Sequence, residues 1–393
     1  MSLAKAGRRR TGVAAVLFGI VLLSGCTPDP YPEDLTYPLR TDLLVVPPYY
    51  DASNIPAAEQ LGNVETMILR IPDKKVVIDP SSLKGDKLDQ LEDQLNDLFG
   101  KPAEPTVNYR DKKLIRTLSL DNETLAAGSV LYRRYCVHCH GLTGDGRGPT
   151  AAWVHPHPRD YRPGLFKFTS VKGGGKPRRE DLLRTLREGI EGTSMPNFRL
   201  LSEEQLEQLV SYVIHLSLRG EVEFEVMSGI KDDSTQSVKK QATRALSNII
   251  KDWAAAQEED ARIMPHPYPK EYGDPADPPK HSIRRGYELF VGDAACIGCH
   301  TDYGRNNSFR YDKWGTIVRP ANLTAGVYRG GRRPIDIYYR IHSGIVPSNM
   351  AATSPVIAGD GRKMWDLVNF VKALPYPAML PDDVHEKVYG SKK

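Results

Sequence analysis

Two short motifs restrict what this chain can fold into more than any other feature of its sequence. Each contains two cysteines three positions apart, followed directly by a histidine: Cys136-Val137-His138-Cys139-His140 and Cys296-Ile297-Gly298-Cys299-His300. On a helical turn, residues i, i+3 and i+4 share one face. Two thiols on that face can bond to the two vinyl groups of one porphyrin, while the adjacent imidazole reaches its iron. The pattern therefore predicts two covalently attached c-type haems, one at each motif.

Two other interpretations of the cysteines stay open at this point. Two separated pairs of thiolates can together bind a structural zinc ion, and a single pair at this spacing can form a redox-active disulfide. Neither alternative requires a histidine after each pair, as His140 and His300 provide, or a methionine at a matching place downstream. Covalent haem attachment accounts for the histidines directly.

The two motifs belong to an internal repeat. A glycine, a leucine and an aromatic residue precede each cysteine pair: Gly128, Leu131 and Tyr132, and then Gly286, Leu289 and Phe290. Further on, the second copy follows the first at a constant offset of 155: Asp181, Leu186, Gly189, Ile190 and Met195 match Asp336, Ile341, Gly344, Ile345 and Met350. A spacing kept over so long a stretch indicates that a whole domain has been duplicated.

The repeat also nominates a sixth ligand for each iron. Met195 and Met350 each lie five residues after a Gly-Ile pair and about 50 residues past the motif histidine. A thioether is a soft ligand that suits ferrous iron. We therefore predict that His140 and Met195 are the axial ligands of the first iron, and His300 and Met350 those of the second.

The first 25 residues have the parts of an export signal. A basic start is followed by the apolar run Val13 to Leu23, which is about half as long as a membrane span. The next tetrad, Leu23-Ser24-Gly25-Cys26, resembles the lipobox of bacterial lipoproteins. The resemblance implies cleavage before Cys26 and acylation of that cysteine. The mature protein would then lie on the periplasmic side, anchored by lipid to the inner or the outer membrane.

The net charge and the positions of the cysteines limit the classes of partner that we expect. Removal of the leader takes four of the 53 basic residues and leaves 49 basic against 49 acidic side chains. A neutral chain lacks the basic surface of a nucleic-acid binder. Exported proteins usually spend cysteines on disulfides, but here the four cysteines beyond Cys26 all lie in the two motifs. We expect redox proteins and a membrane as partners, and no nucleic acid.

Composition and periodicity divide the chain into six parts: a signal peptide at 1–25, a Pro-rich N-terminal arm at 26–118, a first haem domain at 119–220, a linker at 221–280, a second haem domain at 281–385 and a tail at 386–393. In the arm, the β-prone runs Met67–Ile71 and Val76–Ile78 are expected to form a small hairpin, and the leucines from 88 to 98 predict a helix. The arm is expected to pack on the haem domains or on a partner, and to be dispensable for both haems. An amphipathic helix in the linker, from Val238 to Trp253, is expected to brace the domains.

The two haem domains resemble class I c-type cytochromes. Besides the attachment motifs, the resemblance rests on the glycine-rich turn at 141–149 and on a glycine with aromatic residues around each haem: Gly128, Tyr132 and Tyr212, and then Gly286, Phe290 and Phe370. It implies a mainly α fold in which three main helices surround each haem, and the first and last helices cross at the glycine. It also implies that a proline carbonyl, from Pro158 or Pro320, orients each motif histidine.

Histidine and methionine ligation fills both axial positions and leaves the iron no open site for oxygen or peroxide. The resemblance therefore implies an electron carrier rather than an enzyme. Such a carrier would link a respiratory complex or dehydrogenase to a terminal oxidase or to a soluble cytochrome or copper protein. Residues 158–161 and 166–168 are similar to segments of cytochrome subunits in bacterial respiratory complexes such as alternative complex III. The alternatives are a dihaem peroxidase, which needs an open iron, and a haem-based redox sensor.

Overall fold

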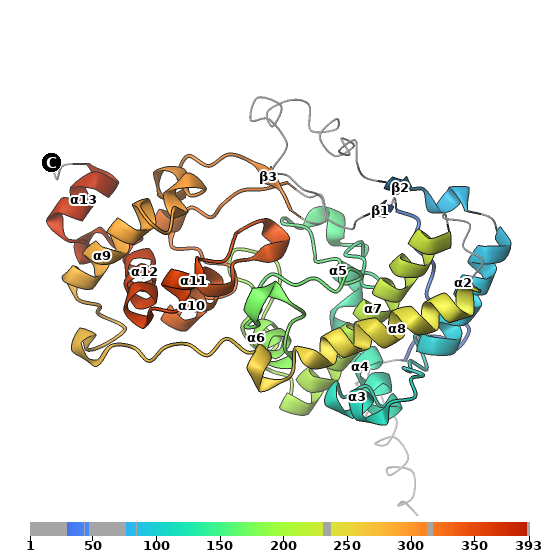
Figure 1. The fold of residues 1–393 in the computed structure, drawn as a ribbon. Coiled ribbons are helices and arrows are strands. Elements are labelled where there is room, and N and C mark those ends of the chain that lie inside the picture. The colour runs from blue at the N-terminus through green and yellow to red at the C-terminus, as the bar shows by residue number, and fades with distance from the viewer. Residues whose placement is uncertain are drawn as a thin grey trace, which may run out of the picture.

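The computed structural model describes residues 30–42, 44–46, 76–83, 85–230, 237–312 and 317–390. Cys26, the leader and the predicted strand Met67–Ile71 lie outside these residues. Helices dominate the described chain, and Figure 1 shows α2 to α8 in one half of the molecule and α9 to α13 in the other. This arrangement confirms the mainly α fold. Within the described ranges, no helix has the length and apolar character to cross a membrane.

The first half is built around two crossing helices, α4 (Asn122–Tyr135) and α7 (Glu203–Ile230). They approach each other closely at Gly128, where an added Cβ would collide with the backbone of α7. The rings of Tyr132 and Tyr212 pack beside this crossing with their centroids 5.2 Å apart. Shorter helices complete this half: α3 (Lys112–Thr117), α5 (Val137–His140) and α6 (Arg179–Glu188).

The second half repeats the same crossing with α9 (Lys280–Val291) and α12 (Gly361–Ala373). An added Cβ on Gly286 would collide with the backbone of α12, and the ring centroids of Phe290 and Phe370 lie 5.3 Å apart. Three further helices belong to this half: α10 (Pro334–Ser343), α11 (Pro355–Ala358) and α13 (Asp382–Tyr389). The crossing at a glycine is therefore present in both copies of the repeat.

We expect Gly128→Ala to destabilise the first half, although alanine is the better helix former. Glycine to alanine in a helix normally gains about 1 kcal/mol, whereas overpacking a tight contact costs about 1–3 kcal/mol. Thermal unfolding followed by circular dichroism should show a lower midpoint for the variant. Gly85→Ala is the matched control, because an added Cβ there meets nothing within 4 Å. Equal midpoints for the two variants would contradict the close approach of α4 and α7.

The N-terminal arm contributes to the core of the first half. Helix α2 (Gly85–Phe99) packs on α7 and on α8, and Leu91, Leu95 and Phe99 are fully buried in the same cluster as the side chains of α4 and α7. A helix whose apolar stripe is shared with α4 and α7 is a structural part of that domain. Helix α2 thus packs on the first domain, as expected of the arm, and we expect its removal to disturb that domain.

Strands are short throughout the described chain. β1 (Leu44–Val46) pairs antiparallel with β2 (Val76–Ile78), and β3 (Arg310–Tyr311) pairs antiparallel with β4 (Ile317–Val318). The predicted partner of β2, residues 67–71, lies outside the described residues. Among the residues that the structure describes, β2 pairs with β1, which also packs on α7. Short 3-10 turns join the elements: η3 (Pro80–Ser82), η4 (Ala151–Trp153), η5 (Lys172–Gly174), η6 (Glu259–Ala261), η7 (Lys270–Tyr272), η8 (Cys296–Gly298), η9 (Thr301–Gly304), η10 (Leu323–Ala325), η11 (Val346–Ser348) and η12 (Pro377–Met379).

Helix α8 (Val238–Ala255) belongs to the first half and does not bridge the two domains. Its apolar face, which includes Leu246, Ile250 and Trp253, is buried in the same core as α2 and α7. The predicted brace is corrected, because an apolar stripe shows that a helix packs but not on which neighbour. Helix α7 also continues through residue 220, so the predicted end of the first haem domain falls inside this helix.

The two halves contact each other through ion pairs and a close aromatic contact. Lys167 Nζ lies 3.2 Å from Oδ2 of Asp312, whose side chain is fully buried. Arg333 reaches Glu188 on α6 at 3.2 Å, and the ring of Phe168 packs against the backbone of Gly330. Each half has its own buried apolar cluster. The molecule is thus two domains that share one partly polar interface.

Candidate haem sites

The first motif lies between α4 and the one-turn helix α5. The amides of Cys139 and His140 donate to the carbonyl oxygen of Cys136 at 3.1 and 2.9 Å, which closes the turn. Both cysteines are free thiols, Cys136 buried and Cys139 half-buried. This single turn places two thiols and one imidazole on the same face, as the spacing predicts.

The imidazole of His140 is held in one tautomer. Its Nδ1–H donates to the carbonyl oxygen of Arg159 at 3.1 Å, and a carbonyl can only accept, so the Nε2 lone pair stays available for a metal. The ring of Tyr161 stacks on the imidazole with 4.6 Å between centroids and 23° between planes. Burial lowers the pKa of His140 to about 4, because the charged ring loses its hydration. His140 is therefore neutral at physiological pH.

The second motif forms the same turn in a more open place. The amides of Cys299 and His300 donate to the carbonyl oxygen of Cys296 at 3.2 and 2.9 Å. The Nδ1–H of His300 donates to the carbonyl oxygen of Ala321 at 3.1 Å, and burial lowers the pKa of this histidine. Cys296 is half-buried and Cys299 is exposed. The second site thus has the same donor set as the first, with less cover.

The carbonyls that orient the histidines are not those of the predicted prolines. In both domains the acceptor is the residue directly after the proline, Arg159 in place of Pro158 and Ala321 in place of Pro320. The carbonyl of Pro320 accepts from the side-chain amide of Asn307 at 2.8 Å instead. The acceptor is shifted by one residue in each copy, so the two domains have the same local geometry. Alignment of the sequence had placed each acceptor one residue too early.

The predicted methionines occupy matching loops. In both domains the isoleucine after the helix-ending glycine donates its amide to the methionine carbonyl, at 3.2 Å for Met195 and 2.8 Å for Met350. The preceding glycines have nearly the same backbone angle, with φ of +69° at Gly189 and +67° at Gly344. Positive φ favours glycine, and a Cβ at either position would collide with the methionine carbonyl. Each methionine is half-buried, and ligation of iron by either one stays a prediction.

Each methionine loop follows a helix whose first turn is capped in the same way, by a backbone amide that donates to a buried aspartate. The amide of Arg178 donates to Asp181 at 3.1 Å at the start of α6, and the amide of Arg333 donates to Asp336 at 3.2 Å at the start of α10. Both aspartates are buried. Sequence reasoning found the aspartates but missed the arginines, although these too are 155 residues apart. It also missed Tyr161, which no periodic signal marks.

The zinc interpretation does not fit this geometry. The two cysteine pairs lie in different halves, and within the described ranges no three His, Cys, Asp or Glu side chains gather as a metal would require. Four thiolates around one ion would need all four sulfurs in one place. Free thiols beside a neutral imidazole with an available Nε2 fit covalent haem attachment at each motif.

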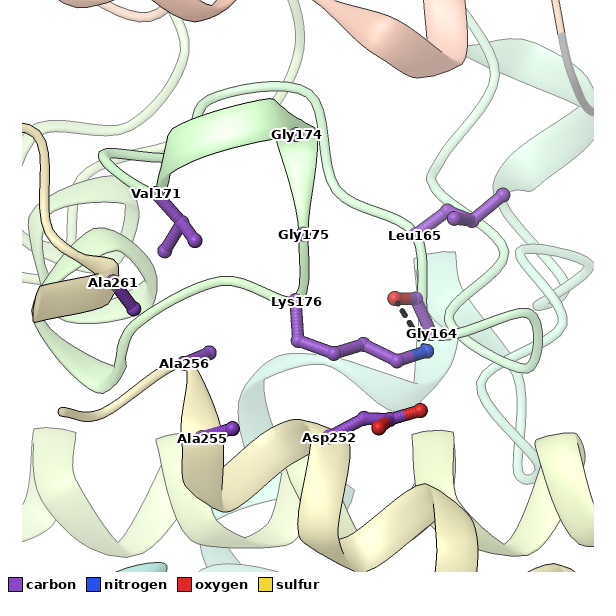
Figure 2. Close-up of a pocket in the computed structure, with 10 residues that line it drawn as sticks. All are labelled: Gly164, Leu165, Val171, Gly174, Gly175, Lys176, Asp252, Ala255, Ala256 and Ala261. Carbon is purple, nitrogen blue, oxygen red and sulfur yellow. Dashed lines mark hydrogen bonds between the residues drawn. The ribbon is translucent and has the colours of Figure 1, made fainter.

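A cavity of about 400 Å³ lies between the loop at 164–176 and α8, and its lining includes none of the motif residues. Figure 2 shows Lys176 extended across it, with Nζ donating to the carbonyl oxygen of Gly164 at 3.3 Å. Lys176 also pairs with Glu221. Much of the lining is glycine and alanine, including Ala255 and Ala256. The cavity therefore lacks the converging polar groups that mark a ligand site.

The first motif and its methionine loop lie in a stretch that matches a known family model. Residues 123–213 match the family model described as "Cytochrome C oxidase, cbb3-type, subunit III". Residues 123–213 form a cytochrome c domain. This domain implies a c-type haem and electron transfer as its chemistry. Beyond the cytochrome c domain, α9 to α13 form a second helical region, which holds the second motif.

Comparison with other proteins adds little to this assignment. No curated protein matches the sequence. Among solved structures, a chain of the Kuenenia stuttgartiensis reducing HAO-like protein complex is similar at 24% identity. The likeness covers 63% of this chain and 95% of that chain, with a TM-score of 0.45. At that score it supports no inference about function.

Proposed function

We propose that this chain is a dihaem electron carrier, anchored by a lipid on Cys26 at the periplasmic side of a bacterial membrane. The observation that carries the proposal is the agreement between the two halves. Each has a histidine that donates to the carbonyl one residue after a proline. Each also has a Gly-Ile turn bonded to the backbone of a methionine. A second haem site with the geometry of the cytochrome c domain is the simplest reason for this repetition.

The residues of each site have separate tasks. Cys136 and Cys139 would hold one haem by thioether bonds, and His140 and Met195 would close its iron. The carbonyl of Arg159 fixes the imidazole. In the second half, the same tasks fall to Cys296, Cys299, His300, Met350 and the carbonyl of Ala321. The bound haems would each supply a one-electron ferric–ferrous couple.

The interface between the domains keeps the two proposed haem sites in one molecule. The buried Asp312 with Lys167, and Glu188 with Arg333, hold the two halves together at 3.2 Å contacts. Lys167 with Asp312 is the more buried of the two pairs, and separating a buried charge pair is costly. The proposed carrier accepts electrons from a respiratory complex or dehydrogenase. It passes them to a terminal oxidase or to a soluble cytochrome or copper protein.

The spectrum of the purified protein tests the carrier assignment. We expect two haems per chain, both low-spin, and a reduced form that does not bind carbon monoxide, because both axial positions of each iron are filled. The pyridine haemochrome assay gives the stoichiometry, and the oxidised protein should show the near-infrared band of methionine ligation. A high-spin haem together with enzymatic turnover of peroxide would replace the carrier with a peroxidase.

The anchor has its own test. Cys26→Ser should release a haem-loaded protein into the soluble fraction or leave its precursor unprocessed, because the acyl chains that bind the membrane are missing. Mass spectrometry of the wild-type N-terminus should show the acyl mass on Cys26. Mature wild-type protein that carries no acyl group and stays in the aqueous phase would refute the anchor.

A further inference from the structure

We propose that the first haem domain faces the membrane, because the segment that follows the anchor is fixed against the first attachment motif. The inference rests on the proposed acylation of Cys26 and goes beyond it. A lipid on a loose tether would let either haem approach the bilayer. Residues 30–42 are not such a tether, because Tyr31 packs on α4, Tyr37 bonds to α7 and Asp42 pairs with Arg162.

Tyr31 is the first fixed point after the anchor. Its side chain is 6% exposed, and the guanidinium carbon of Arg133 lies 5.5 Å from its ring centroid. Arg133 belongs to the last turn of α4, three residues before Cys136. Burial raises the pKa of Tyr31 far above its ordinary value, and the nearby groups of Tyr212 and Cys136 raise it further. Through its contact with Arg133, Tyr31 is held beside the end of α4 that leads into the first motif.

Tyr37 provides a second and more deeply buried fixed point. Its hydroxyl oxygen lies 2.7 Å from that of Tyr212 on α7, and its carbonyl oxygen accepts from Arg219 at 3.1 Å. The ring of Tyr212 packs on Tyr132, whose hydroxyl donates to the carbonyl oxygen of Gly141 at 2.9 Å. Gly141 directly follows the haem-binding histidine of the first motif. A continuous line of contacts thus joins the segment to the first haem site.

Charged groups fix the end of the segment. The amide of Arg40 donates to Glu223 at 2.7 Å, and Glu223 also pairs with Arg219 at 3.1 Å in a fully buried site. Asp42 lies 2.9 Å from Arg162. Releasing the segment would take Asp42 away from Arg162 and the Arg40 amide away from the buried Glu223, although Arg162 keeps Asp160 and Glu223 keeps Arg219. The segment therefore stays with the first domain when the protein is on the membrane.

Chain length sets how far the first domain can rise from the bilayer. Five residue steps separate Cys26 from Tyr31, and an extended chain spans at most about 3.5 Å per step, so the leash is no longer than about 18 Å. The acylated cysteine itself is held at the headgroup level. Helices α9 and α13 of the second half lie at the opposite end of the molecule from α2 (Figure 1). The second haem is accordingly placed toward the aqueous phase.

Energy transfer from the membrane to each haem tests this orientation. The acylated full-length chain is bound to vesicles of phosphatidylethanolamine and phosphatidylglycerol that carry a fluorophore on a fraction of the headgroups. Cys296→Ala with Cys299→Ala leaves only the first haem, and Cys136→Ala with Cys139→Ala leaves only the second. We expect the first variant to quench the dye nearly as the wild type does and the second to quench it several-fold less.

A second measurement covers the case in which a variant lacking one haem misfolds. A flexible Gly-Ser segment of about 20 residues inserted after Thr27 of the wild type should reduce quenching several-fold and leave vesicle binding unchanged, because it lengthens the leash roughly fivefold. The same insertion after Gly390 is the matched control, and it should change neither the quenching nor the binding to vesicles. Equal or stronger quenching by the second haem, or no effect of the insertion after Thr27, would overturn the orientation alone. Failure of the wild type to bind vesicles would refute the anchor and the orientation together.

Discussion

Replacing Met195 with alanine should open the first haem to carbon monoxide and leave the second haem closed. The two methionines lie in separate domains, and each is held by its own Gly-Ile turn. Loss of a thioether leaves one axial position of one iron empty. Optical and magnetic spectra should show one haem change from low-spin to high-spin, with a fall in its reduction potential because a soft ligand favours ferrous iron. Met350→Ala should give the mirror result at the second haem.

Met264→Ala is the matched control for both substitutions. Met264 is 68% exposed and has no counterpart in the repeat, so its removal should leave both haems low-spin and closed. A Met195→Ala variant with unchanged spectra would show that another residue closes the first iron. A variant in which both haems open at once would show that the domains do not hold their haems independently.

Leu95→Ala should unfold the first haem domain well before the second. Leu95 on α2 is fully buried against the core that contains α4 and α7, and truncating such a leucine costs about 2–5 kcal/mol. Thermal unfolding followed in the visible band of each haem should show an early transition for the first haem and an unchanged one for the second. The separate apolar clusters of the two halves are the reason for this selectivity.

The exposed neighbour Asp93 provides the control on the same helix. Asp93→Ala should leave both transitions in place, since no buried contact is lost. If Leu95→Ala also left the first transition unchanged, α2 would be an appendage, and the arm would be dispensable as its composition suggests. Removal of residues 30–110 would then spare both haems, whereas the structure leads us to expect loss of the first.

Residues close together in the chain were predicted well. The cysteine and histidine spacing needs only one helical turn, and the turn is present at both motifs. The Gly-Ile pairs before Met195 and Met350 have the same backbone in both domains, with glycine where φ is positive. These features depend on contacts within about a dozen residues, so their pattern can be read without knowing what surrounds them.

Contacts between segments that are distant in the chain could not be predicted from the sequence pattern. The amphipathic patterns of α2 and α8 were recognised, but their shared place in the first core was not. Tyr31 and Tyr37 lie in a Pro-rich stretch with no periodicity, yet they are buried beside α4 and α7. The carbonyls of Arg159 and Ala321 differ from the predicted acceptors by one residue.

The sequence by itself therefore determined the two attachment turns, the repeat and the mainly helical character of the chain. Only the tertiary structure decided which domain the arm packs on and which carbonyl orients each histidine. It also decided that residues 30–42 pack on α4 and α7. The physical reason is that residue spacing and helix propensity determine only the structure of neighbouring residues. An apolar stripe on a helix, in contrast, can be buried equally well against any complementary surface. The choice among such surfaces belongs to the packing of the whole molecule.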